Sequence, residues 1–228
     1  MKIFNCSGKP IFECNCETTD ECLEEAAEKK INLQGAYLQG FDLRDIYLRG
    51  VDLTDANLID ANLEGTNLMD ADLQKTYLYG VNLGYALLQG ADLQNAYLDH
   101  ANLVGTDLRD ANLCYASLCC ANLHGADLRG ANLIDVDLCS TSLMGADLRG
   151  ANLWGEKLTK NPIYINAGLR WEIWIMDKRI RIGCQMHSTK AWENFTDEQI
   201  SKMSVNALDF WRVWKKPILE MAKAHQGG

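Results

Sequence analysis

The sequence lacks the features that mark a membrane protein, a secreted protein or a common class of enzyme. Its 228 residues contain no run of eighteen apolar residues and no signal-peptide pattern, so we expect a soluble, cytoplasmic protein without membrane contacts. No P-loop or dinucleotide fingerprint is present, and none of the four histidines falls in a nucleophile motif. We therefore expect a protein that is not an enzyme, with no catalytic residues and no cofactor.

What the sequence does contain is leucine at every fifth position from Leu33 to Leu158, twenty-six times without a miss. A helix repeats near 3.6 residues and a strand at 2.0, so neither explains a period of five. A small or β-branched residue lies two positions before each leucine, and Asp or Asn mostly lies one position before it. Gly, Asp or Asn mostly lies two positions after it, where tolerance of positive φ suits a tight turn. The pattern predicts stacked units whose leucines and small residues point inward.

This pattern resembles the pentapeptide repeat family, as the stretch VDLTDANLIDANLEGTNLMDADL at residues 51–73 illustrates. The resemblance covers residues 31–160 and implies an all-β solenoid, a right-handed quadrilateral β-helix with four units in each coil. That length gives about six and a half coils, and a spacing of ~4.8 Å between stacked strands gives a rod ~30 Å long. We expect the regular helix to end at Glu156, which puts a charge where an inward alanine should lie.

The two ends of the chain differ from the repeat. A hairpin around residues 7–10 and a helix starting at Thr18 predict a cap that covers the exposed strand edges of the solenoid. The C-terminal part predicts a small α+β domain. Its expected elements are strands Leu169–Met176 and Arg179–Cys184 and helices starting at Ser188, Thr196 and Asn206, the last kinked or restarted at Pro217. The expected domains are 1–30, 31–160 and 161–228.

The C-terminal part is rich in tryptophan, which has two interpretations. In the first, tryptophan side chains form a protein-binding interface, and the candidates are Trp171, Trp174, Trp192, Trp211 and Trp214. Alternatively, the same tryptophans fill a small core. The segment at residues 182–203 also resembles C-terminal segments of phage and prophage pentapeptide repeat proteins, a likeness that brings no known activity.

Nine cysteines in a cytoplasmic chain are expected to be free thiols. Cys6, Cys14, Cys16 and Cys22 lie close in sequence and could in principle hold zinc. Their spacing matches no strong zinc pattern, and Cys14 and Cys16 are expected on one face of a strand while Cys22 lies on a helix. We therefore expect no metal site.

The charges are unevenly distributed, with 17 acidic and 8 basic residues at positions 31–160. Residues twenty apart should stack in one column, which predicts a distinct charge for each face of the rod. The most acidic face combines Asp52, Asp55, Asp72, Asp92 and Asp135 with Lys75. Another face should form a self-neutralising ladder of Asp107, Asp127 and Asp147 with Arg109, Arg129 and Arg149. Because Asp and Asn interchange before the leucine, the acidic column also has a purely structural interpretation.

Two functions follow from these patterns. In the first, the acidic rod mimics DNA, which carries about one negative charge per 1.7 Å of axis. By resemblance to family members that occupy the DNA-binding saddle of type II topoisomerases such as gyrase, it would inhibit or shield a DNA-binding enzyme or a defence protein, without binding nucleic acid itself.

In the second, the rod is a rigid spacer and the C-terminal domain binds a protein partner or dimerises. A scaffold that binds a small ligand between rod and tail stays open as a third hypothesis. A homodimer formed through either end is also an open alternative.

Overall fold

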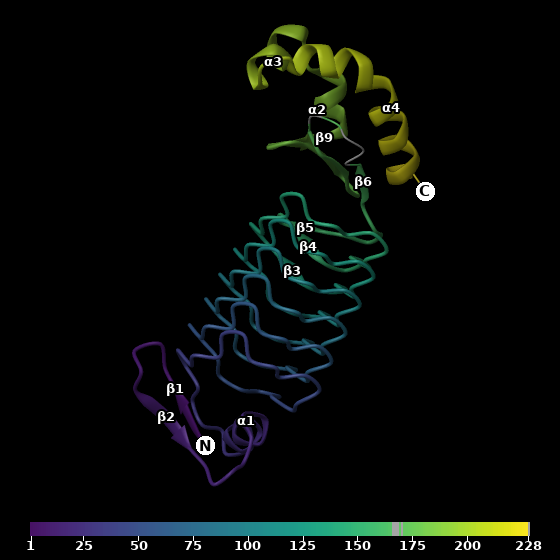
Figure 1. The fold of residues 1–228 in the computed structure, drawn as a ribbon. Coiled ribbons are helices and arrows are strands. Elements are labelled where there is room, and N and C mark those ends of the chain that lie inside the picture. Colours follow the sequence, from purple (N-terminus) through teal and green to yellow (C-terminus); the bar gives the residue numbers. More distant parts are fainter. Residues whose placement is uncertain (166–168, 170, 228) are drawn as a thin grey trace. The chain divides into compact units, whose positions relative to one another are not determined.

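The computed structural model describes residues 1–165, 169 and 171–227. These residues divide into two compact units, Met1–Lys157 and Leu158–Gly228, which are described separately (Figure 1). No helix among the described residues is both long and apolar enough to cross a membrane.

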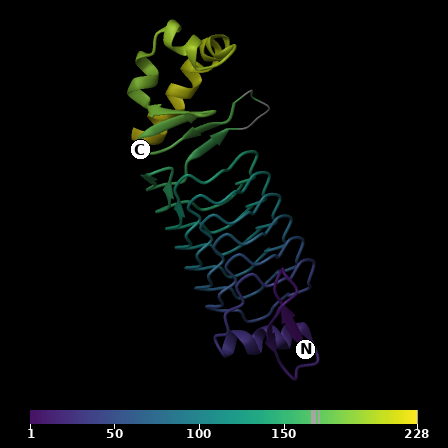
Figure 2. The same cartoon turned by 90° about the vertical axis from the view of Figure 1, so that its left-hand side faces the viewer.

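The first unit is a β-helix in which each coil takes twenty residues. Parallel bridges join positions twenty apart, as at Asn57 and Tyr77. The Asn57 backbone N–H donates to the Ala36 carbonyl of the coil before, and the Leu58 N–H donates to the Tyr77 carbonyl of the coil after, both at 2.8 Å. Four five-residue units therefore form the four sides of a coil, and residues 31–155 make a little over six coils. Figures 1 and 2 show these coils stacked in register.

Leucine fills the interior of the coils. Every leucine of the five-residue period is buried except Leu143, which is partly exposed. The inward small residue is mostly alanine. Where it is threonine, the hydroxyl donates to a backbone carbonyl of the preceding coil, as Thr66 Oγ1 does to Leu43 at 2.6 Å. This bond satisfies a polar group that burial would otherwise destabilise.

The corner of each unit has a left-handed backbone. All twenty-five positions from Gly35 to Gly155 in steps of five have positive φ, and thirteen of them are not glycine. Six of those thirteen are aspartate, a residue that tolerates this conformation better than most. Glycine at some corners also avoids a steric clash between coils, because a Cβ at Gly65 would meet the carboxylate of Asp45, one coil earlier. The prediction that the residue two positions after each leucine forms a tight turn with positive φ is therefore confirmed.

A cap covers the first coil. It consists of an antiparallel hairpin, β1 (Lys2–Phe4) and β2 (Pro10–Glu13), and of helix α1 (Thr19–Glu28). The Tyr37 N–H donates to the Phe4 carbonyl at 2.8 Å, so the cap pairs with the open edge of the coil. The side chain of Thr18 accepts from the Glu21 N–H and starts α1.

The other end of the β-helix closes by a reversal of the chain. Strands β3 (Asn132–Leu133) and β4 (Asn152–Leu153) pair in parallel, one coil apart. The next strand, β5 (Glu156–Lys157), instead pairs antiparallel with β4, with Glu156 opposite Leu153. The parallel stacking thus stops at Glu156, as its charge predicts.

The second unit contains a four-stranded antiparallel sheet in the order β6-β7-β8-β9, with three helices. The elements are β6 (Ile163–Ile165), β7 (Ile173–Ile175), β8 (Arg179–Ile182), β9 (Gln185–Ser188), α2 (Thr189–Asn194), α3 (Asp197–Met203) and α4 (Ala207–Gly227). Isoleucines of β7 and β8 pack against Trp192 of α2 and Trp211 and Ile218 of α4.

Several expectations for this unit need correction. The sequence did not predict β6 or β9, and of the expected strand Leu169–Met176 only Ile173–Ile175 is strand, while residue 170 lies outside the described residues. Pro217 does not restart the helix, because α4 runs through it. Proline removes the bond to the carbonyl four residues earlier, on Val213, but that residue is exposed and water can replace the bond.

Candidate functional site

Three aspartates form a column on one side of the β-helix. Parallel bridges join Asp52 to Asp72 and Asp72 to Asp92, with Asn32 before and Asn112 after them. Their carboxylates are thus spaced one coil apart, about 4.8 Å in a stacked sheet. We call these three residues the aspartate ladder. All three side chains are partly buried at their base and reach the surface.

Each carboxylate of the ladder accepts a local backbone hydrogen bond. The donors are the N–H groups two residues later, of Thr54 at 3.0 Å, Gln74 at 3.1 Å and Gln94 at 3.0 Å. Asparagine makes the same bond elsewhere in the repeat, as Asn57 does with the N–H of Ile59. The turn therefore requires an oxygen at this position but not a charge.

The charges of the ladder are not neutralised within the unit. None of the ion pairs formed by the described residues includes the aspartate ladder. The fourth candidate on this face, Asp55, occupies a corner with φ of 57° and accepts from the amide of Gln34 at 3.3 Å. Lys75 is exposed at the corner one coil later and likewise forms no ion pair within the described part of the chain.

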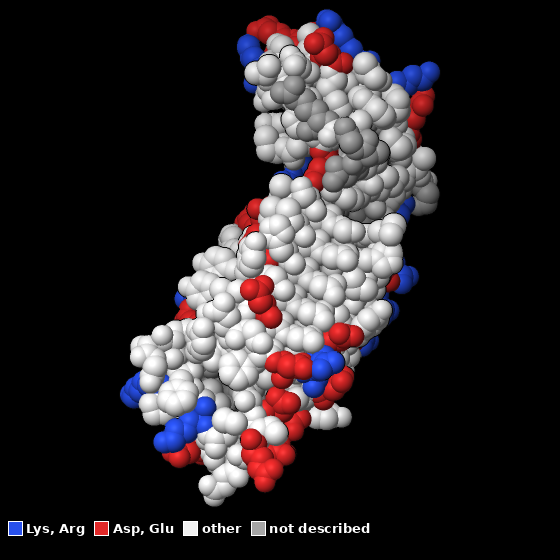
Figure 3. All heavy atoms as spheres, in the orientation of Figure 1, with Lys and Arg blue, Asp and Glu red and all other residues white. Residues whose placement is uncertain are grey.

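A second face carries the predicted self-neutralising ladder. The Arg129 guanidinium lies 2.6 Å from Asp127 and 3.8 Å from Asp147, one coil later. Its hydrogen bonds hold the pKa of Asp127 below the usual range, and Arg109 and Arg149 do the same for Asp107 and Asp147. The prediction of alternating charges is confirmed. In the view of Figure 3, carboxylates also gather over the N-terminal coils, while uncharged atoms cover most of the remaining repeat surface.

The tryptophans of the second unit divide into two groups. Trp174, Trp192 and Trp211 are only 2–3% exposed, so these three candidates are core residues that offer little surface to a partner. The indole N–H of Trp192 donates to the Ile180 carbonyl at 2.9 Å. Trp171 and Trp214 are half-buried and remain available at the surface.

A small pocket opens among the aromatic residues of the same unit. Its volume is about 120 Å³, and its lining includes Trp171, Trp192, Phe210, Trp211 and Cys184. The indole Nε1 of Trp211 is buried and has no hydrogen-bond partner among the described residues. The sequence gave no signal for this pocket, because it forms where β8, β9, α3 and α4 meet.

The cap brings together the thiols of three of the four N-terminal cysteines that lie close in sequence. Cys14, Cys16 and Cys22 have their sulfur atoms within 4.8 Å of one another. The expectation that strand and helix would keep them apart is wrong, since the chain turns back between β2 and α1. All nine cysteines are free thiols.

Comparison with known proteins agrees with the coil geometry. The family model for pentapeptide repeats matches eight copies, over residues 31–70, 46–84, 76–113 and 116–155, which is more than half of the chain. The chain belongs to the pentapeptide repeat family. Pentapeptide repeat proteins form right-handed β-helices, and they are generally structural or binding proteins rather than enzymes. The family match leaves the cap and the second unit outside it.

Solved pentapeptide repeat structures are similar over the β-helix. HetL of the cyanobacterium Nostoc sp. strain PCC 7120, involved in heterocyst differentiation regulation, is 30% identical over 53% of this chain and 76% of its own, with a TM-score of 0.21. Rfr23 of the cyanobacterium Cyanothece 51142 is 32% identical over 58% and 97%, with a TM-score of 0.28. QnrB1, a plasmid-mediated fluoroquinolone resistance protein, is 16% identical over 57% of this chain and 72% of its own, with a TM-score of 0.25. No curated protein sequence matches the chain.

Proposed function

We propose that this protein is a non-enzymatic binding protein that presents the aspartate ladder to a basic surface of a DNA-binding enzyme. The observation that carries the proposal is the stack of three carboxylates without ion pairs among the described residues, on a helix whose other charged column neutralises itself. Carboxylates that need no charge for the fold are free to act on a partner.

The spacing of the ladder carboxylates determines how closely this surface matches the charge density of DNA. Duplex DNA carries about one charge per 1.7 Å, whereas one column of the β-helix offers about one per 4.8 Å. Such a surface steers a basic partner and competes with DNA, but it does not reproduce the full charge density of a duplex. By the resemblance of the repeat to topoisomerase-binding members of the family, we propose a type II topoisomerase as the first partner to test.

The test replaces all three ladder aspartates by asparagine, which keeps the backbone hydrogen bond and removes the charge. A matched control removes three charges from the neighbouring face, by Asp60→Asn, Asp99→Asn and Asp137→Asn. Binding to purified gyrase is measured by titration at low and high salt, with duplex DNA as competitor. We expect the ladder variant to lose about tenfold or more in affinity at low salt, and the control to lose much less.

Equal losses in the two variants would show that only net charge matters. Unchanged binding by the ladder variant would remove the main support for the acidic face.

A second candidate function rests on the pocket of the C-terminal unit, which would dock an apolar side chain of a protein partner. Its aromatic lining and the unpartnered Trp211 N–H favour this candidate. Ser204, the C-cap residue of α3, lies at the exposed rim, so Ser204→Phe would fill the pocket, and Ser201→Phe within α3 is the control. Partner binding that survives Ser204→Phe would rule out the pocket as the docking site.

A further inference from the structure

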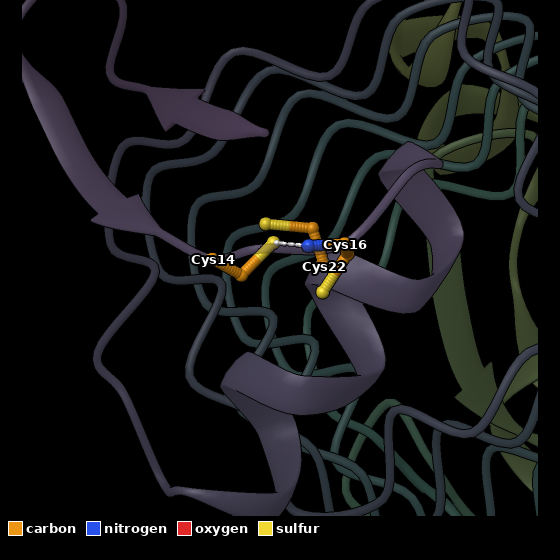
Figure 4. A group of neighbouring side chains, drawn as sticks. All are labelled: Cys14, Cys16 and Cys22. Carbon is orange, nitrogen blue, oxygen red and sulfur yellow. Dashed lines mark hydrogen bonds between the residues drawn. The ribbon is translucent and has the colours of Figure 1, made fainter.

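The N-terminal cap contains a cluster of three thiols. Cys14 follows strand β2, Cys16 lies two residues later and Cys22 lies in the first turns of α1. Figure 4 shows the three side chains converging between the strand and the helix. Within the described residues, no other group of three or more His, Cys, Asp or Glu side chains brings its ligand atoms within 4.8 Å of one another.

The burial of the cluster suits a bound cation. Cys22 is fully buried and Cys14 is 7% exposed, while Cys16 is half-buried and leaves a route from solvent. Buried cysteines often act only as small apolar side chains. Two of these three differ because they form polar contacts: the Cys16 backbone N–H donates to Cys14 Sγ at 3.4 Å, and the Cys16 thiol donates to Glu25 Oε2 at 2.9 Å.

Glu25 offers a fourth ligand, a carboxylate oxygen, at the edge of the cluster of three sulfurs. Its Oε2 atom accepts from Cys16, whereas its Oε1 atom pairs with Lys29. An acidic ligand held by a second charged group is a common arrangement around bound metals. The backbone nitrogen of Met1 donates to the Cys14 carbonyl at 2.8 Å, which ties β1 to the chain beside the cluster.

We propose that Cys14, Cys16, Cys22 and Glu25 bind a zinc ion. Zinc prefers four tetrahedral ligands with Zn–S distances of about 2.3 Å, which places the sulfur atoms about 3.8 Å apart. The sulfur separations of up to 4.8 Å require shifts of about an ångström or less, within the reach of side-chain rotation, whereas Glu25, which contacts Cys16, has to turn its carboxylate toward the other two sulfurs. With four protein ligands the site is closed and structural, and it ties α1 to the end of β2.

A zinc ion bound in the cap would also help to keep the first coil of the β-helix covered. The same cap pairs with the first coil through Phe4 and Tyr37, so a metal that fixes the cap also holds the cover over the strand edge. This role is independent of the aspartate ladder, and the zinc site can fail without affecting the proposed function.

The test uses the full chain in a reducing buffer, stripped of metal with a chelator. Cobalt(II) is added first as a spectroscopic probe, because tetrahedral thiolate coordination gives ligand-field and sulfur-to-cobalt charge-transfer bands, and zinc is then added to displace it. The variants are Cys16→Ser and Glu25→Gln. The controls are Cys6→Ser, an exposed thiol of the same cap, and Cys139→Ser, an exposed thiol of the β-helix.

We expect one equivalent of metal in the wild type and in both controls. Cys16→Ser should weaken zinc binding by about a hundredfold and Glu25→Gln by about tenfold. Zinc should also raise the unfolding midpoint of the wild type and of the controls but not of Cys16→Ser, with circular dichroism confirming that this variant folds. A wild type without tetrahedral cobalt bands would overturn the proposal. So would bands that persist in Cys16→Ser or vanish in Cys139→Ser, or a disulfide between two of the three cysteines in reducing buffer.

Discussion

Replacing the aspartate ladder by asparagine should stabilise the β-helix. Each ladder carboxylate accepts one backbone N–H, which an amide oxygen accepts equally well. An amide adds a donor that can reach the coil below. The repeat already contains such bonds, from Asn82 to Asn62 at 2.9 Å, from Asn102 to Asn82 at 2.8 Å and from Asn112 to Asp92 at 3.0 Å.

The size of the effect follows from two contributions. Three new amide bonds at a partly exposed surface contribute roughly 0.5 kcal/mol each, the low end of the usual range. The removal of two neighbouring like-charge pairs, about 4.8 Å apart, relieves less than about 1 kcal/mol per pair before salt screening. The sum is about 2 kcal/mol, which corresponds to a rise of about 4–8 °C in the unfolding midpoint for a unit of this size.

Denaturant unfolding followed by circular dichroism measures this change at two salt concentrations. The charge contribution should shrink at high salt, whereas the amide contribution should persist. A variant that is less stable than the wild type at both salt concentrations would refute the reasoning. The carboxylates would then support the fold in a way that the hydrogen-bond pattern does not reveal, and they would not be free for a partner.

Two further predictions concern the charge ladder and the core. Asp127→Asn should destabilise the protein near neutral pH; because Arg129 lowers the folded-state pKa of Asp127, its stabilisation is present above the unfolded-state pKa of about 3.9 and is lost as pH falls through the folded-state pKa. The stability gap to the wild type should therefore close as pH falls below about 3.9 and through the lowered folded-state pKa of Asp127, and Asp137→Asn, which loses no ion pair among the described residues, is the control in the same denaturant titrations. Trp192→Phe should cost about 1–2 kcal/mol more than Trp211→Phe, because only the first removes a buried hydrogen bond; similar unfolding midpoints for the two variants would contradict this.

The five-residue period predicted stacked units, and the resemblance to the pentapeptide repeat family implied a β-helix with four units in each coil. Four units of five residues place residues i and i+20 in contact, so the pairing of Arg129 with Asp127 and with Asp147 one coil later followed from counting. The same rule gave the aspartate ladder as a column.

The cap and the C-terminal unit were harder to predict because no period connects their residues. The approach of Cys14 and Cys16 to Cys22 depends on how the chain turns between β2 and α1, which local patterns do not specify. Burial of Trp174, Trp192 and Trp211 depends likewise on how sheet and helices pack. Composition marks aromatic residues as either core or interface, and only the packing decides between them.

The fold of the β-helix does not require a particular distribution of charged side chains over its faces. The coils that carry Asp52, Asp72 and Asp92 carry asparagine at the equivalent position half a coil away, at residues 62, 82 and 102. Both sets accept the same backbone bond from the residue two positions later, as Asn82 does from Gly84. The repeat pattern therefore identifies the fold without identifying a partner, because charge can move between faces while the coil stays the same.

Exchanging the two sets tests whether position matters apart from net charge. A variant with asparagine at all three ladder positions and aspartate at residues 62, 82 and 102 has the net charge of the wild type. It gains amide bonds on one face and loses them on the other, so its unfolding free energy should stay within about 1 kcal/mol of the wild type. We expect partner binding to fall as in the simple ladder variant, since the carboxylates now face away from the original surface. Binding equal to that of the wild type would mean that the partner senses overall charge and recognises no particular face.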